Sequence, residues 1–430
     1  MRMRTIHRLA LLALALTALL LAGCEKKSEG PKEIVIGVIY PMSGPVAQVG
    51  ADAAAAVNAM VDIVNNKHEG LNIPLAAGEG LPNLGGAKVR VIIADHQGKP
   101  EVGQGEAERL ITQEKVAALF GSYYSSVTAT ASQVAERMQV PMVNGESTSP
   151  QLTERGFKWF FRTGPHDGEF TQVMYDFIKD YQAKKGIKLN SVGILHEDTL
   201  WGADSGKVQE VLAKEANYKV TNNIAYRAKT TSMTSEVQLL KAASPDVLLP
   251  SSYTPDALLF MRTAKELDYN PRLLIAQNAG YTDPTLLETL GSDAEGVITR
   301  SPFNYDLAGQ IPLIGKVNEI FRKHSNNRDL SDVPVRAFIG FMTLVDAINR
   351  AGSTDPEKIR EALANTNIPG EQLMVPWSGV QFGENGHNKL VRGLLMQVQN
   401  GKYCTIYPFE VSACEVLYPM PSWKDKAKMK

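Results

Sequence analysis

Short apolar segments of strand length alternate with amphipathic segments of helical length along most of this 430-residue chain. The first run of this pattern predicts strands and helices in turn at residues 33–40, 46–65, 89–95, 100–113, 116–121, 126–138 and 140–144. The expected strands are continuous apolar runs, such as EIVIGVIY at 33–40, which is typical of strands that are buried on both faces. The alternation therefore predicts a parallel sheet that is covered by helices on both sides.

The same pattern starts again after residue 150. It predicts strands and helices in turn at residues 191–198, 202–217, 218–226, 233–243, 245–252, 255–267 and 271–277. Residues 311–350 then have mostly helical character, and the tail from Leu373 has the character of β-strands, in the segments MVPWSGVQF, LVRGLLMQVQ and KYCTIYPFEV. One hydrophobic core seldom serves a chain of this length, so we expect two α/β units of similar size.

The first 23 residues have the features of a signal peptide. A positively charged start precedes an apolar stretch, Leu9–Leu21, that is too short to span a bilayer. The segment LLAGC resembles the lipobox of bacterial lipoproteins, which implies cleavage before Cys24 and attachment of lipid to its thiol. The alternative is an ordinary secretory signal with an incidental cysteine. We expect an exported protein of the periplasm or cell envelope, held to the membrane through lipid on Cys24, with residues 24–33 as a polar tether.

Two further cysteines, Cys404 and Cys414, lie near the C-terminus. In an oxidising compartment such a pair forms either a disulfide or two separate buried thiols, and the sequence leaves both open. The chain has no CxxC or Cys/His spacing of the kind that binds zinc, so we expect no metal and no cofactor.

Charge and motifs exclude several classes of function. The formal net charge is −1 and no cluster of Lys and Arg follows the signal peptide, which argues against a nucleic-acid partner. Motifs of zinc hydrolases (HExxH), serine hydrolases (GxSxG) and phosphate-binding loops are missing from the sequence. His196 and Glu197 are the best candidates for acid–base chemistry, but no nucleophile accompanies them, so we expect a protein that is not an enzyme.

Polar and aromatic residues gather where the expected strands end. These residues are Tyr124 and Ser125 after 116–121, Glu146, Ser147 and Thr148 after 140–144, Trp201 after 191–198, Tyr253 after 245–252, and Asn278 after 271–277. Open α/β sheets bind ligands outside the carboxyl ends of their strands. Because such loops occur in both α/β units, we expect them to line one cleft between two lobes.

Three segments carry a family resemblance: YPMSGPVAQVGADAAAAV at 40–57, GSYYSSVTATAS at 121–132 and STSPQLTERGFKWFFRT at 147–163. In this order they resemble the type I periplasmic binding proteins of the branched-chain amino acid transport family. The resemblance implies two doubly wound, Rossmann-like lobes joined by three crossover strands. By analogy, the first lobe would comprise 34–163 and 303–393, and the second lobe 164–302 and 394–421.

The resemblance also implies how the cleft works. The lobes would close on a small molecule, and the closed form would dock on an ABC permease. Ser125 and Thr148 fall on positions that hold the α-carboxylate of amino-acid ligands in the family, where the following helix N-termini favour an anion. Trp201 and Tyr253 fall on aromatic positions that close over the ligand from the second lobe.

Two residues depart from the family pattern. Asn278 stands where the family has an acidic partner for the ammonium group of the ligand, and an amide cannot neutralise that charge. Glu146 occupies a position that is usually small and neutral. Either Glu146 takes over the contact with an ammonium or amide, or it turns away into a salt bridge and the cleft accepts an uncharged or anionic ligand.

The sequence therefore predicts the substrate-binding component of an ABC importer, in a form that we expect to be monomeric. Its ligand would be a small organic solute, namely an amino acid, an amide or an aromatic acid, and leucine, isoleucine and valine are less favoured because of Asn278 and Glu146. The alternative is a ligand sensor of the same fold that signals to a separate membrane or cytoplasmic partner.

Overall fold

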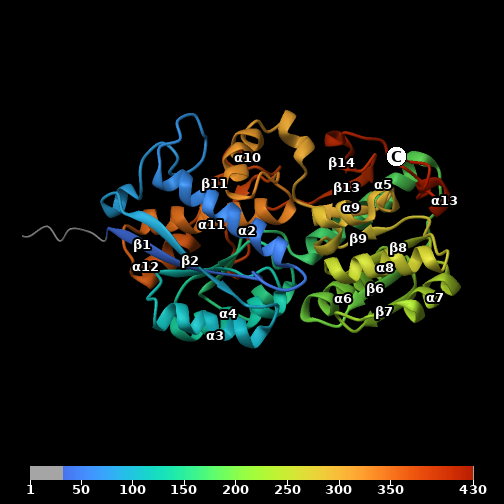
Figure 1. Ribbon diagram of the computed structural model, residues 1–430, viewed down its shortest axis with the longest axis horizontal. Helices are drawn as coiled ribbons and strands as arrows, with labels where there is room; N and C mark the ends of the chain where they lie inside the picture. Colours follow the sequence, from blue (N-terminus) through green and yellow to red (C-terminus); the bar gives the residue numbers. More distant parts are fainter. Residues whose placement is uncertain (1–31, 430) are drawn as a thin grey trace, which may run out of the picture.

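The computed structural model describes residues 32–429. The expected signal peptide, the lipid attachment at Cys24 and most of the tether lie outside these residues. The described chain forms two lobes that lie side by side along the long axis of the molecule (Figure 1). None of its helices combines the length and the apolar character that a membrane span requires.

The first lobe is built around a five-stranded parallel sheet with the order β2-β1-β3-β4-β5. Its strands are β1 (Glu33–Tyr40), β2 (Lys88–Asp95), β3 (Ala118–Gly121), β4 (Met142–Asn144) and β5 (Phe160–Arg162). Its helices are α2 (Ala47–Asn65), α3 (Pro100–Thr112), α4 (Ser125–Met138), α10 (Leu313–His324), α11 (Asp332–Ala351) and α12 (Pro356–Ala364). A short two-stranded ladder of β11 (Ile368–Pro369) and β12 (Gly379–Val380) completes this part.

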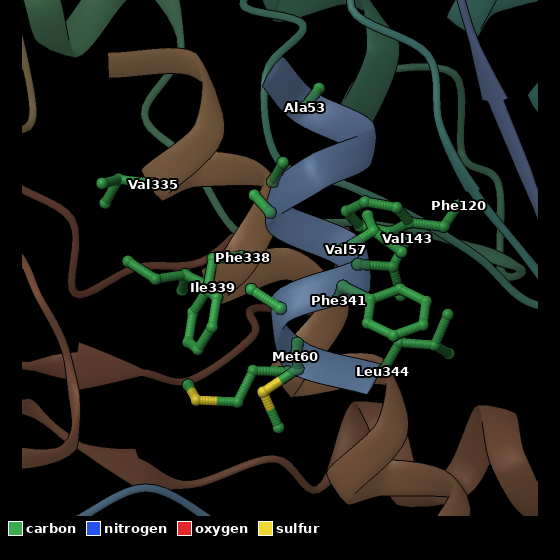
Figure 2. Close-up of a cluster of buried hydrophobic side chains, with 14 of the residues drawn as sticks. Ala53, Val57, Met60, Phe120, Val143, Val335, Phe338, Ile339, Phe341 and Leu344 are labelled. Carbon is green, nitrogen blue, oxygen red and sulfur yellow. The ribbon is translucent and has the colours of Figure 1, made fainter. Parts of the chain in front are cut away.

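Small side chains allow α2 to approach its neighbours closely. Ala53 and Ala56 of α2 are fully buried, and the helix packs against α11, whose residues Phe338 and Phe341 are also buried (Figure 2). On the other face of the sheet, α3 and α4 pack against each other and cover a separate apolar cluster. The two layers of helices fix the strands, and thereby the loops at their carboxyl ends.

The second lobe contains a three-stranded parallel sheet and a four-stranded sheet, which are linked by a bridge between Leu248 and Leu274. Across both sheets the order is β7-β6-β8-β9-β10-β13-β14, and the last two strands run antiparallel to their neighbours. The strands are β6 (Ser191–Glu197), β7 (Lys219–Tyr226), β8 (Val247–Ser251), β9 (Ile275–Ala276), β10 (Ile298–Ser301), β13 (Leu394–Gln399) and β14 (Lys402–Tyr407). The helices are α5 (Asp167–Lys185), α6 (Leu200–Glu215), α7 (Thr234–Ala243), α8 (Thr254–Glu266), α9 (Pro284–Leu290) and the terminal α13 (Trp423–Lys426).

The predicted fold class is confirmed, although several elements were not expected from the sequence. Among them are β5, α5, β10 and α12. The expected strand in MVPWSGVQF is wrong for most of its length, because only Gly379–Val380 forms a strand, apart from an isolated bridge between Phe382 and Asn388. Its buried residues, among them Met374 and Trp377, instead cover the apolar core of the first lobe as irregular chain.

Cys404 on β14 and Cys414 form a disulfide, with their Cα atoms 6.1 Å apart. The bridge closes a short loop, because the two residues are separated by 10 positions. Replacing both cysteines by serine is expected to lower the free energy of unfolding by about 3 kcal/mol, since the unfolded chain regains the freedom of that loop. Urea denaturation of the wild type, the double variant and the reduced wild type tests this, and equal midpoints for all three would contradict it.

Candidate functional site

The carboxyl ends of strands from both lobes meet at one place between the lobes. Aromatic side chains from the two sides are in direct contact there. The ring centroid of Tyr124 lies 4.3 Å from that of Tyr253, and Trp201 lies 4.7 Å from Tyr253. Tyr123, which is buried beside them, lies 5.3 Å from Tyr124 and 5.5 Å from Tyr253. The structure thus brings together Tyr124, Trp201 and Tyr253, which sequence reasoning had placed in separate loops.

The loops that present these rings contain residues in unfavourable backbone conformations. Tyr123 has φ 74° and Asn278 has φ 51°, both in the left-handed region that favours glycine. The Tyr123 hydroxyl is also buried with no hydrogen-bond partner among the described residues. Such strain persists only where the surroundings impose it, and it is common in ligand-binding sites.

The three hydroxyl residues predicted in the first lobe all take part in the local hydrogen-bond network. Ser125 Oγ accepts from the backbone N–H of Ser149 at 3.4 Å, and Thr148 Oγ1 accepts from Arg300 Nη2 at 3.3 Å. Ser147 Oγ donates to the backbone carbonyl of Tyr123 at 2.9 Å. Ser147 therefore ties the two strand-end loops of the first lobe together.

Glu146 points into the interior of the first lobe. Its carboxylate accepts a hydrogen bond from the Tyr40 hydroxyl at 2.6 Å and another from Asn144 Nδ2 at 3.3 Å, and the residue is 3% exposed. Burial raises the pKa of Glu146, although the Tyr40 hydrogen bond and the nearby Arg336 guanidinium oppose this effect. Within the described residues the carboxylate makes no ion pair, so the salt bridge offered as one of the two alternatives is not formed, and Tyr40 supplies a hydrogen bond in its place.

Asn278 belongs to a buried network centred on Arg336 of α11. Arg336 donates to Asn278 Oδ1 at 3.2 Å, to the backbone carbonyl of Glu146 at 2.6 Å and to Asp332 Oδ2 at 2.5 Å. Asn278 Nδ2 in turn donates to Asp332 Oδ2 at 2.7 Å. The two residues that depart from the family pattern are therefore connected through one guanidinium group.

A second buried ion pair lies behind Thr148. Arg300 Nη2 donates to Asp167 Oδ1 at 2.6 Å, and both side chains are fully buried. Burial raises the pKa of the Asp167 carboxyl to about 6, against the opposing effect of Arg300. Arg300 Nη1 and Asp167 Oδ2 have no hydrogen-bond partner within residues 32–429. Charged side chains that are buried this deeply are stable only when they are paired, as Arg300 and Asp167 are.

Sequence reasoning missed these two ion pairs. A signal was present in each case, because Arg336 interrupts an apolar helix and Arg300 interrupts a short buried strand. Charged side chains are rarely buried unless they are paired, so an arginine in a buried element indicates a partner. The sequence does not show which partner that is.

The lobes are also joined directly by polar contacts. Asp204 of α6 in the second lobe accepts a hydrogen bond from Gln151 Nε2 at 2.5 Å and one from the Ser149 hydroxyl, both in the first lobe. Arg328 of the first lobe pairs with Asp52 of the same lobe at 3.2 Å and with Glu288 of the second lobe at 3.3 Å. Asp204 and Arg328 therefore each link the two lobes through polar side chains.

A cavity of about 600 Å³ lies at the mouth of the cleft, next to the aromatic cluster. Residues from both lobes line it: Ser43, Pro45, Val46, Gln97, Gly98, Pro100, Tyr124 and Ser126 from the first, and Glu197, Thr199, Leu200, Ala228, Lys229, Thr230, Tyr253, Pro255 and Asp256 from the second. Its volume is in the range of small-molecule sites. Tyr124 and Tyr253 are the predicted site residues that face it.

His166, Glu169 and His387 are the one group of possible metal ligands in the described residues, with ligand atoms within 4.8 Å of one another. Most of their ligand atoms are already engaged in hydrogen bonds. His387 Nε2 lies 2.9 Å from Glu169 Oε1, and His387 Nδ1 accepts from the buried Arg162 at 3.1 Å. His166 Nδ1 caps α5 by accepting from the backbone N–H of Gly168. The Arg162 guanidinium beside His387 repels a metal cation, so His166, Glu169 and His387 serve to stabilise the fold.

Comparisons with known proteins agree with this architecture. The family model described as periplasmic binding protein matches residues 33–402. Leu/Ile/Val-binding protein homolog 7 of Brucella suis is 27% identical over 420 residues, which cover 95% of this chain and 99% of that protein.

Solved structures show the same fold. A leucine-binding protein from Thermotoga maritima superposes with a TM-score of 0.73 at 22% identity, covering 88% of this chain and 100% of that one. A solute-binding protein of an ABC transporter from Rhodopseudomonas palustris, solved with 3,4-dihydroxybenzoic acid, has a TM-score of 0.72 at 18% identity and covers 92% of this chain and 99% of that one.

These matches confirm the resemblance found in the three sequence motifs. The curated relatives are named as binding proteins, and membership of the periplasmic binding protein family implies export to the periplasm. Because the family model covers most of the chain and the superpositions extend over both lobes, this chain belongs to the periplasmic binding proteins, as a type I member related to the Leu/Ile/Val-binding proteins.

Proposed function

We propose that this protein captures a small organic solute between its lobes and delivers it to the permease of an ABC importer. The observation that carries the proposal is the contact of Tyr124 with Tyr253 across the cleft, with Trp201 packed on Tyr253, beside a cavity that both lobes line. Aromatic side chains from opposite lobes would enclose a ligand and exclude water when the lobes close. The affinity would come from this enclosure, and no covalent step is required.

The ligand would be an amino acid, an amide or an aromatic acid. The related structures named above include a leucine-binding protein and a complex with 3,4-dihydroxybenzoic acid, so both aliphatic and aromatic solutes occur on this fold. We propose Ser125 and Thr148 as the residues that hold one end of the ligand in the first lobe. Glu146 and Ser147 would shape that loop, and Asn278 would face the ligand from the second lobe.

We also propose how the protein is attached in the cell envelope. Acylation of Cys24 would hold the protein to the membrane, and the molecule would act as a monomer. We also propose the lobe boundaries given by the resemblance, at 34–163 with 303–393 and at 164–302 with 394–421.

Mass spectrometry of small molecules released from the purified protein tests the proposed function. We expect one defined solute, and its addition to ligand-free protein should raise the unfolding temperature. A ligand at 100 times its Kd stabilises the folded state by about 2.7 kcal/mol. The absence of a bound solute, together with the absence of a thermal shift with L-isoleucine, acetamide and 4-hydroxybenzoate, would contradict the proposal.

Trp201→Ala is expected to weaken binding of the co-purified solute by about 10- to 100-fold, because it removes an aromatic ring that covers the cleft. Isothermal titration measures the effect. Tyr218→Ala is a matched control, since Tyr218 is also aromatic and stacks on Tyr175 at the amino end of β7, on the opposite edge of the sheet. An equal loss of affinity in both variants would indicate a general effect on folding and would contradict the assignment of Trp201.

A further inference from the structure

The cavity at the mouth of the cleft has an unusual distribution of charge for a site that binds acids. Two carboxylates, Glu197 and Asp256, line it, and both residues are buried at 1% and 3% exposure. Lys229 is the single cationic side chain among the lining residues in the described chain, and it is exposed to solvent. The cavity is therefore acidic on the side of the second lobe.

Glu197 is incompletely satisfied by the protein itself. Its Oε1 accepts a hydrogen bond from the Thr199 hydroxyl, whereas no donor of the described chain reaches Oε2. Desolvation raises the pKa of this carboxyl to about 8, and the nearby Asp256 and Asp198 add to that effect, while the Thr199 hydrogen bond and, more weakly, Lys229 oppose it. A buried acid with a free oxygen that faces a cavity is the arrangement expected of a group that awaits a partner.

Aromatic rings form another wall of the same cavity. Tyr124 and Tyr253, whose centroids are 4.3 Å apart, both line it. The faces of aromatic rings attract cations, and this attraction grows when water is excluded. Carboxylates beside aromatic faces therefore favour a cation over the other groups that a small solute can present.

Two other kinds of ligand group fit this cavity less well than a cation. A carboxylate placed here would be repelled by Glu197 and Asp256 in their ionised forms, and beside a protonated Glu197 it would leave the buried acid without a counter-charge. An apolar group would fill the volume but would leave the free oxygen of Glu197 without a partner, at the cost of its desolvation. A protonated amine or guanidinium satisfies the free oxygen and compensates the charge at the same time.

We propose that this cavity is the subsite for a positively charged group of the solute, an alkylammonium or a guanidinium, held by Glu197 and Asp256 against the faces of Tyr124 and Tyr253. The inference rests on the proposed solute-binding function and narrows its ligand class to solutes with a cationic end. It also supplies a counter-charge at a different place in the cleft from Asn278, whose amide cannot provide one.

Pairs of solutes that differ mainly in one positive charge test whether the cavity recognises that charge. L-Lysine is compared with L-norleucine, L-arginine with L-citrulline, and 4-(aminomethyl)benzoate with 4-ethylbenzoate, all by isothermal titration. We expect the cationic member of at least one pair to bind about 10- to 100-fold more tightly than its neutral counterpart, the range of a hydrogen bond to a charged group. The solute released from the purified protein should carry an amine or guanidinium.

Glu197→Gln should remove most of this preference, because it weakens binding of the cationic probes. Asp256→Asn provides a second variant that tests the same cavity if the first does not fold. Glu210→Gln, an equal change of charge on the exposed surface of α6, should preserve the preference.

The outcomes distinguish the two proposals. Neutral or anionic solutes that bind as tightly as cationic ones, or a cationic preference that survives in Glu197→Gln and Asp256→Asn, would overturn the inference and leave the solute-binding function standing. The absence of binding by every probe and of any co-purified solute would overturn both.

Discussion

Replacing Arg336 by methionine is expected to lower the free energy of unfolding by about 3–5 kcal/mol. Arg336 is 1% exposed and compensates the charge of Asp332, which is equally buried. Its guanidinium also holds the backbone carbonyl of Glu146 and the side chain of Asn278. The variant leaves a buried carboxylate without its cation and removes the group that connects the loops of the two lobes.

Equilibrium denaturation in urea measures this loss. Arg322→Met is the matched control, because its ion pair with Asp329 is exposed, at 46% and 51%, and such pairs contribute less than about 1 kcal/mol. Adding Asp332→Asn to Arg336→Met should recover part of the stability, since the uncompensated charge is then gone. A loss in Arg336→Met no larger than that in Arg322→Met would show that the buried network does not stabilise the fold.

The regular elements were predictable because they follow from the spacing of apolar residues. The run EIVIGVIY gave β1 with the observed bounds, and the Ala-rich segment that follows gave α2 to within one residue. α5 was missed although its sequence carries the signal, because Phe170, Met174, Phe177 and Tyr181 recur at helical spacing and all are buried. β5 contains only three residues, too few for any period to be recognised.

The location of the cleft was also predictable, whereas its internal chemistry was not. The rule that ligands bind at the carboxyl ends of strands correctly brought Tyr124, Trp201 and Tyr253 to one place. The orientation of Glu146 depends on Tyr40, which is 106 positions away, and the network around it depends on Arg336, 190 positions away. Such pairings arise only when the sheet is assembled, so no local pattern in the sequence reports them.

Glu197 makes the stability of the protein depend on pH in a defined direction. Its pKa is about 8 in the folded state, mainly because of burial, against an ordinary value of 4.5. Between these values the folded state binds a proton that the unfolded state has released, so stability falls as the pH rises through this window. Below about pH 4.5 both states are protonated and the effect vanishes. The groups that face the carboxyl are Asp198, Asp256, Lys229 and the Thr199 hydroxyl.

Glu197→Gln is therefore expected to match the wild type in stability near pH 5 and to exceed it at pH 8.5 by on the order of 4 kcal/mol, the free energy that corresponds to such a shift in pKa. Glutamine keeps the shape of the protonated acid but cannot ionise. Urea denaturation of ligand-free protein at both pH values measures the difference. Because Glu146 and Asp167 also have raised pKa values and contribute to the slope in the same direction, the comparison between variant and wild type isolates Glu197. Parallel pH profiles of the two proteins would show that Glu197 ionises as an exposed carboxyl does. It would then carry its charge at neutral pH without any ligand cation.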